Sequence, residues 1–60
     1  MFKEYSVVLA KKDLENVPKG SRGTVLIIYE EGNAFEVEFV TEQNETIAIL
    51  TVAGDDIELE

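Results

Sequence analysis

Four basic side chains gather in one segment of this sequence and are the first candidates for chemistry. Lys11, Lys12, Lys19 and Arg22 all lie between positions 11 and 22. Basic groups on one loop can bind the phosphates of a nucleic acid. The segment 11–22 is therefore a candidate nucleic-acid-binding loop.

The stretch KGSRGTV, residues 19–25, raises a second question, because glycines near a lysine also occur in phosphate-binding loops. A phosphate loop presents converging N–H groups at a helix N-terminus. Here Gly20 and Gly23 precede an apolar run that is typical of a strand. The glycines therefore favour a tight corner, and Gly23 is expected to let its strand begin close to a neighbouring strand.

Acidic residues dominate the rest of the chain. Residues 1–22 hold all five bases and three acids, whereas residues 23–60 hold ten acids and no base, so the formal net charge is −8. Glu36 and Glu38 point to one side of a predicted strand, and Glu30 and Glu31 lie in the turn before it. Such a surface could bind a basic protein through rapid, steered association. The alternative is an ordinary solvated face that guards the sheet.

The sequence offers little for catalysis or for a metal. It contains neither cysteine nor histidine, which leaves no Cys–His nucleophile pair and no usual zinc ligand set. Asp55 and Asp56 are adjacent, but the pattern of a calcium-binding loop is absent. We expect no catalytic residue, no metal site and no cofactor.

The elements that must position these side chains read as strands. β-branched and aromatic residues form apolar runs, and within residues 34–40 Phe35, Val37 and Phe39 alternate with Glu36 and Glu38. The expected strands are 5–10, 24–29, 34–40, 46–52 and a short closing strand at Ile57. A long loop follows the first strand, turns fill 30–33 and 41–45, and one 3₁₀ turn fits 53–56.

The expected core comes from the inward side of these strands. Strand 24–29 is apolar almost throughout, so it is covered on both faces or carries a bulge. The sequence does not decide which side chains of 24–29 and 46–52 point inward. Leu14 and Val17 are expected to anchor the long loop. The predicted core is Val8, Leu14, Val25, Ile28, Phe35, Val37, Phe39, Ile49, Leu50 and Ile57.

Length and composition predict one domain over residues 1–60. The chain is 45% hydrophobic, which argues against disorder. Neither a signal peptide nor a run of about 20 apolar residues is apparent, so we expect a soluble cytoplasmic protein. The order of elements predicts an all-β, five-stranded SH3-like small barrel, whose closure would remove sheet edges.

The sequence also resembles a known family. The resembling stretches are SVVLAKKDL (6–14), VPKGSRGTV (17–25), FEVEFV (35–40), ETIAILTV (45–52) and DDI (55–57). They are similar to an uncharacterised bacterial family, often cyanobacterial, of small SH3-like barrels. That family has no settled activity, and similar proteins are sometimes encoded beside toxin-like partners. More distantly, the glycines before the strand resemble KOW-type barrels and the small barrel subunits of photosystem I and nitrile hydratase.

Two functional hypotheses follow. The first is a non-catalytic protein-binding module, of an antitoxin-type or accessory kind, that uses the acidic residues Glu30, Glu31, Glu36 and Glu38 against a basic or toxin-like protein. The second is nucleic-acid binding through Lys11, Lys12, Lys19 and Arg22, which the overall negative charge opposes. An edge strand could also pair two copies of the chain.

Overall fold

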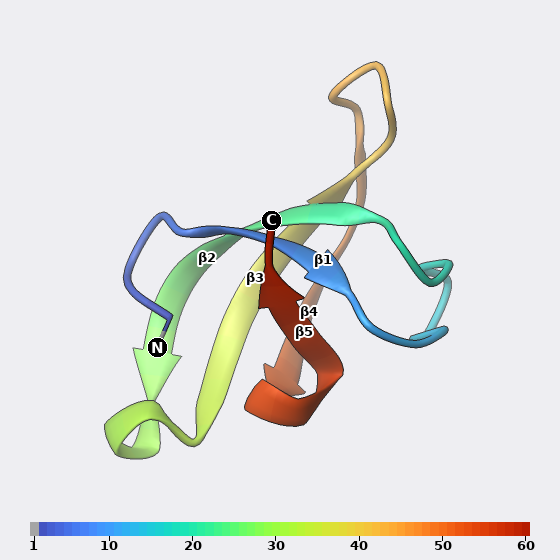
Figure 1. The fold of residues 1–60 in the computed structure, drawn as a ribbon. Coiled ribbons are helices and arrows are strands. Elements are labelled where there is room, and N and C mark those ends of the chain that lie inside the picture. Colours follow the sequence, from blue (N-terminus) through green and yellow to red (C-terminus); the bar gives the residue numbers. More distant parts are fainter. Residues whose placement is uncertain (1) are drawn as a thin grey trace.

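The computed structural model describes residues 2–60 and is all-β (Figure 1). It contains five antiparallel strands and two short 3₁₀ turns. In chain order these elements are β1 (Val7–Ala10), β2 (Arg22–Tyr29), η1 (Glu30–Gly32), β3 (Ala34–Val40), β4 (Thr46–Ala53), η2 (Gly54–Asp56) and β5 (Ile57–Leu59). The predicted all-β class with five strands, the long loop after the first strand and the 3₁₀ turn before the last strand are confirmed.

The strands form one curled sheet in the order β4-β3-β2-β1-β5. The long strand β2 curves across the molecule, so that its two ends lie in different parts of the sheet (Figure 1). The sheet is open, in contrast to the expected closed barrel, because β4 and β5 do not pair within residues 2–60. The turn η2 carries the chain from β4 to the free side of β1, where β5 pairs for only three residues.

The core lies inside the curled sheet. Its buried side chains are Val8, Ala10, Val17, Val25, Phe35, Val37, Phe39, Val52 and Ile57. Residues 34–40 alternate as predicted, with Phe35, Val37 and Phe39 inward. Leu14 and Leu50 pack against this cluster but are only partly buried.

Two predicted core residues are wrong: Ile49 lies in an outward row of β4, and Ile28, although it lies in an inward row, is near the end of β2 and stays exposed. Ile49 is 52% exposed and Ile28 is 39% exposed. In β2 the register shifts between Val25 and Ile27, so Leu26 forms a bulge. A bulge was one of the two alternatives that the sequence indicated for this strand. Beyond the bulge, Ile28 lies opposite Phe35, one residue before the end of β2.

The connecting segments are held by local contacts. In the long loop, the backbones of Leu14 and Val17 exchange two hydrogen bonds, and Val17 is 1% exposed, so the predicted anchor is confirmed for Val17. In the turn after β2, Glu31 and Gly32 have positive φ angles.

Gly23 has a steric role in β2. A Cβ atom at this position would lie 2.6 Å from Val37 Cγ1 and 2.9 Å from Phe39 Cδ1. Only glycine therefore lets β2 and β3 approach at this point. This finding confirms the structural interpretation of the second glycine in KGSRGTV.

Candidate functional site

The four basic residues of segment 11–22 are positioned by the long loop, and two of them are paired with acids. Lys12 Nζ lies 3.2 Å from Asp56 Oδ1, and Arg22 donates to Glu60 Oε2 at 2.6 Å. Both carboxylates come from the C-terminal end of the chain, which the sheet order brings beside the loop. The loop therefore presents less free positive charge than the sequence indicates.

The other two basic residues lie beside a further acid. Lys11 and Lys19 line a shallow hollow of about 350 Å³ together with Glu58. The structure thus brings the predicted basic group near three carboxylates of the acidic C-terminus. No continuous basic surface follows from these placements.

The KGSRGTV corner has its N–H groups occupied. The Lys19 N–H donates to Asp13 Oδ1 at 2.8 Å, and the Gly20 N–H donates to the Ala10 carbonyl oxygen at 2.8 Å. The Ser21 N–H donates to the Pro18 carbonyl oxygen at 3.1 Å. A phosphate would need these donors to be free and convergent. The corner is therefore a structural turn.

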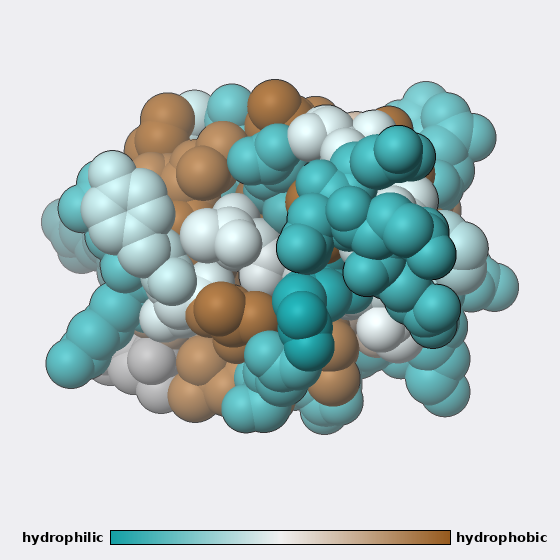
Figure 2. Space-filling model, turned by 90° about the horizontal axis from the view of Figure 1, so that it is seen from above, coloured by the Kyte–Doolittle hydropathy of each residue, from teal (hydrophilic) through white to brown (hydrophobic). Residues whose placement is uncertain are grey.

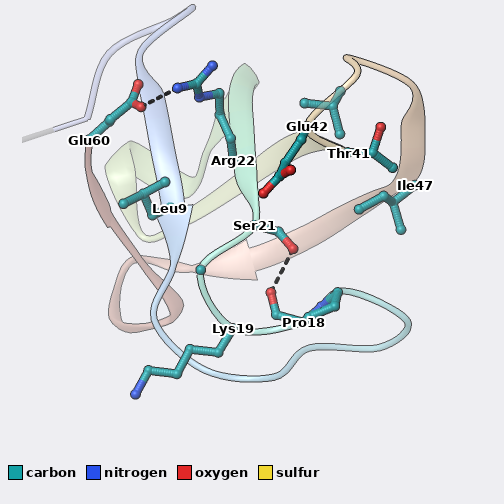
Figure 3. A pocket seen from close by; sticks show the side chains of 11 residues that line it. Leu9, Pro18, Lys19, Ser21, Arg22, Thr41, Glu42, Ile47 and Glu60 are labelled. Atoms are coloured by element: carbon teal, nitrogen blue, oxygen red, sulfur yellow. Dashed lines mark hydrogen bonds and ion pairs between the residues drawn. The ribbon is translucent and has the colours of Figure 1, made fainter.

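An open groove of about 560 Å³ adjoins this corner (Figure 3). The Arg22 side chain turns to Glu60, and Lys19 points away from the other labelled side chains (Figure 3). The groove therefore lacks a cluster of charges of one sign. Its lining residues are Leu9, Pro18, Lys19, Gly20, Ser21, Arg22, Val40, Thr41, Glu42, Ile47 and Glu60.

Glu36 and Glu38 lie on the outward face of β3, as the alternating pattern predicts. The Tyr29 hydroxyl donates to Glu36 Oε1 at 2.8 Å, and the Thr46 hydroxyl donates to Glu38 Oε2 at 2.5 Å. The hydrogen bond to Glu36 is the main cause that raises the pKa of Tyr29 above its ordinary value of 10.0. Both carboxylates are thus held by side chains of neighbouring strands.

Exposed apolar side chains flank these two carboxylates across the strands. Ile27 lies opposite Glu36 on β2 and is 43% exposed, and Ile49 lies opposite Glu38 on β4 and is 52% exposed. In the Glu38 row, Val7 follows beyond Thr24 and is 40% exposed. We call this surface the Glu36–Glu38 face; it comprises Val7, Ile27, Tyr29, Glu36, Glu38 and Ile49.

The apolar members of this face were missed from the sequence. Ile49 was assigned to the core, and Ile27 and Val7 were not singled out. The register of β4 against β3 would have identified Ile49, since residues opposite each other in a ladder share a face. The surface also carries apolar side chains elsewhere, and Figure 2 shows brown areas separated by hydrophilic ones.

The structure separates the acids of the turn from those of β3. Glu31 lines a hollow of about 410 Å³ together with Ile28 and Phe35, which belong to the inward rows of the sheet. It therefore does not join the outward Glu36–Glu38 face. The Glu30 side chain lies outside the described part of the structure.

The described residues offer neither a metal-binding cluster nor a membrane-spanning helix. Among the residues that the structure describes, no three His, Cys, Asp or Glu side chains are grouped as a metal site would need. Within residues 2–60, no helix has the length and apolar character needed to cross a membrane.

Comparison with known proteins identifies the family. A family model described as a domain of unknown function (DUF4926) matches residues 4–59. No curated protein and no solved structure gives a significant match. Because the matched range covers nearly all of its 60 residues, the chain belongs to this family of domains of unknown function.

Proposed function

We propose that the protein is a non-catalytic interaction module whose Glu36–Glu38 face binds a basic protein. The observation that carries the proposal is the pairing, across neighbouring strands, of hydrogen-bonded carboxylates with exposed isoleucines. Ile27 and Glu36 share one row, and Ile49 and Glu38 share the next. Such a surface offers both an apolar contact area and fixed negative charges.

The apolar rows would supply the affinity. Burial of an exposed aliphatic side chain contributes about 25 cal/mol per Å² of apolar area removed from water. Tyr29, at the end of the same face, is 36% exposed and adds an aromatic ring with a polar tip. Aromatic residues of this kind are enriched in protein interfaces.

The carboxylates would supply orientation and partner choice. The chain has a net charge of −8, so a basic partner is attracted from a distance and an acidic one is repelled. Glu36 and Glu38 are already held by Tyr29 and Thr46. Less side-chain freedom is therefore lost when a partner's lysine or arginine binds them.

The finer identity of the module is part of the proposal. We assign the curled five-stranded sheet to the SH3-like barrels and the family to bacteria, as the resemblance of the sequence implies. A basic toxin-like protein, or the basic subunit of an enzyme, fits the required partner. The cytoplasmic location stays a prediction from the sequence.

Nucleic-acid binding is the second candidate, and its support is weaker. It rests on the basic loop, but the charges of Lys12 and Arg22 are neutralised by Asp56 and Glu60. A mobility-shift assay at low salt separates the two candidates. Retention of RNA or DNA by the wild type, lost when Lys11 and Lys19 are replaced by alanine, would favour the second.

Charge reversal with a matched control tests the proposal. The double variant Glu36→Lys and Glu38→Lys changes the face, whereas Glu42→Lys and Glu45→Lys makes the same charge change at exposed acids of the 41–45 turn. A protein captured by the wild type is purified, and its direct affinity for each variant is measured by calorimetry. We expect the face variant to bind about tenfold or more weakly and the turn variant to stay within about threefold.

Two outcomes would contradict the proposal. Equal losses in both double variants would show that only net charge matters. A purified partner that is acidic, or that binds the face variant as tightly as the wild type, would remove the Glu36–Glu38 face from the interface. Circular dichroism of each variant shows that the fold is retained.

A further inference from the structure

A hollow beside the turn between β2 and β3 is walled by side chains from three separate segments. Its volume is about 410 Å³, within the range of about 300–1,000 Å³ that is typical of ligand sites. The beginning of the described chain, the turn after β2 and the turn η2 meet there, at one end of the molecule (Figure 1). We call it the Phe2–Phe35 hollow; its lining residues are Phe2, Ile28, Glu31, Gly32, Phe35 and Gly54.

Two aromatic rings and an isoleucine give this hollow an apolar wall. The ring centroids of Phe2 and Phe35 lie 5.2 Å apart and the ring planes meet at 79°, so the edge of one ring faces the other. Gly54 adds no side chain beside them, whereas a Cβ atom there would lie 3.7 Å from Phe35 Cε2 and 3.8 Å from Phe2 Cε2. Ile28 is largely exposed and adds an aliphatic surface. A further aromatic ring would therefore find partners for both edge and aliphatic contacts.

Glu31 adds a negative charge to this apolar wall. It is the one charged residue among the described lining residues, and its side chain is exposed. The ion pairs within residues 2–60 are those of Lys12 and Arg22, and residues 23–60 contain no base. A carboxylate beside an apolar wall complements a cation that carries an apolar group. In this hollow that cation has to come from a ligand.

The backbone of Glu31 supports a role for its side chain. Glu31 has φ 57° and ψ 35°, in the left-handed region, and Gly32 follows with φ 94°. Turns with two such residues favour asparagine, aspartate or glycine at the first of them, so a glutamate there is strained. Residues that break a local rule in this way are concentrated at ligand sites.

We propose that the Phe2–Phe35 hollow binds a small arylalkylamine, that is, a protonated amine joined by a short chain to an aromatic ring. The ring packs against Phe2, Ile28 and Phe35, and the ammonium group lies beside the Glu31 carboxylate. Such an amine is protonated at neutral pH, because its pKa is close to that of lysine, about 10.4. The hollow shares no residue with the Glu36–Glu38 face, so the two sites are independent.

The charge of Glu31 selects an amine over other aromatic molecules. An aromatic carboxylate would meet Glu31 and a chain of net charge −8, which would oppose its binding. A neutral aromatic molecule keeps the apolar contacts but gains no attraction to Glu31. Because Glu31 is exposed, its ion pair should change the affinity by about two- to fivefold. The apolar wall therefore supplies most of the affinity, and Glu31 supplies the preference for a cation.

Titration of the full chain with phenethylamine, followed by nuclear magnetic resonance, tests the proposal. For so small a ligand we expect a Kd of about 1 mM at low salt, with the amide shifts centred on Gly32, Phe35 and Gly54. Phenethyl alcohol is the neutral analogue and should bind about two- to fivefold more weakly. Added salt should weaken the binding of the amine and leave that of the alcohol unchanged.

Substitutions separate the charge from the apolar wall. Glu31→Gln should weaken the amine about two- to fivefold and leave the alcohol unchanged. Glu45→Gln is the matched control, because it removes one charge from an exposed acid outside the hollow; it should leave the amine within about 1.5-fold. Gly54→Leu puts a side chain beside both rings and should weaken both ligands about fivefold or more. Circular dichroism shows whether each variant is folded.

Nuclear Overhauser contacts between the ligand ring and the rings of Phe2 and Phe35 test the site without a substitution. The proposal is overturned by the absence of a saturable shift up to about 20 mM amine, or by shifts confined to the Glu36–Glu38 face. Equal affinities for amine and alcohol would overturn it as well, and so would equal losses in Glu31→Gln and Glu45→Gln. Arginine amide, which stands for a protein side chain, brings no aromatic ring and should bind more weakly than phenethylamine. Tighter binding of arginine amide would assign the hollow to a protein and overturn the proposal.

Discussion

Lys12 Nζ lies 3.2 Å from Asp56 Oδ1, so the beginning of the long loop is tied to the turn between β4 and β5. The Lys11 N–H reinforces this tie by donating to the Asp56 carbonyl oxygen at 2.8 Å. Asp56 also accepts from the Ala53 N–H at 3.0 Å and so holds both ends of η2 together. One carboxylate therefore joins a local turn to a segment more than forty residues earlier in the chain.

Substitution of Asp56 should separate its two roles. Asp56→Asn keeps an acceptor for the Ala53 N–H but loses the exposed ion pair with Lys12, which contributes up to about 1 kcal/mol to the free energy of unfolding. Asp56→Ala also removes the capping bond, which adds about 1 kcal/mol to the loss. Urea unfolding of the two variants measures the difference, and equal losses would show that the capping bond contributes nothing.

Acid unfolding should also depend on Asp56. The hydrogen bond from Ala53, followed by Lys12, lowers the pKa of this carboxyl below its ordinary value of 3.8. The unfolded chain therefore binds the proton more readily, and stability is lost as pH falls below about 3.8 through the folded pKa. At neutral pH, well above this range, the contribution of the Asp56 carboxylate to stability is fully present. Asp56→Asn should flatten the fall in stability below pH 3.8, as urea midpoints at each pH would show.

Gly23 should tolerate no side chain. Gly23→Ala places a methyl group 2.6 Å from Val37 Cγ1 and 2.9 Å from Phe39 Cδ1. Because Val37 and Phe39 are both buried, the variant should lose about 1–3 kcal/mol of unfolding free energy. Gly54→Ala is the control, since its Cβ would lie 3.7 Å from Phe35 Cε2. Urea unfolding should place the control within about 0.5 kcal/mol of the wild type; similar losses at both glycines would contradict the steric argument.

Val17 should govern the order of the long loop. Val17→Ala removes two buried methyl groups and should lower the unfolding free energy by about 1.5–2.5 kcal/mol. Trypsin should then cut faster at Lys19 and Arg22, because the loop loses its anchor. Leu14→Ala should have the smaller effect, since Leu14 is only partly buried. If Leu14→Ala accelerated trypsin cleavage more than Val17→Ala, Leu14 rather than Val17 would be the residue that anchors the loop.

The ionisation of Tyr29 should report on the Glu36–Glu38 face. In a Tyr5→Phe background, Tyr29 is the one remaining tyrosine, and its pKa is raised chiefly by its hydrogen bond to Glu36. Glu36→Gln should therefore lower the pKa toward 10.0, as measured by ultraviolet absorbance at high pH. Glu38→Gln should leave the titration nearly unchanged. An unshifted titration in Glu36→Gln would show that the hydrogen bond is absent in solution.

The sequence by itself determined the elements and one face of the sheet. Strict alternation over 34–40 placed Phe35, Val37 and Phe39 inside and Glu36 and Glu38 outside, because successive side chains of a strand point to opposite faces. The 3₁₀ turn and the buried Val17 were also predicted from local patterns. Such features depend on neighbours in the chain, which a sequence shows directly.

Only the tertiary structure decided which charges meet and which apolar residues remain exposed. The ion pairs of Lys12 and Arg22 join residues 44 and 38 positions apart, and the bulge at Leu26 and the parity of β4 exposed Ile27 and Ile49. The physical reason is that cross-strand register and strand order are long-range properties. They are set when the sheet curls around its core, and no local pattern of residues specifies them.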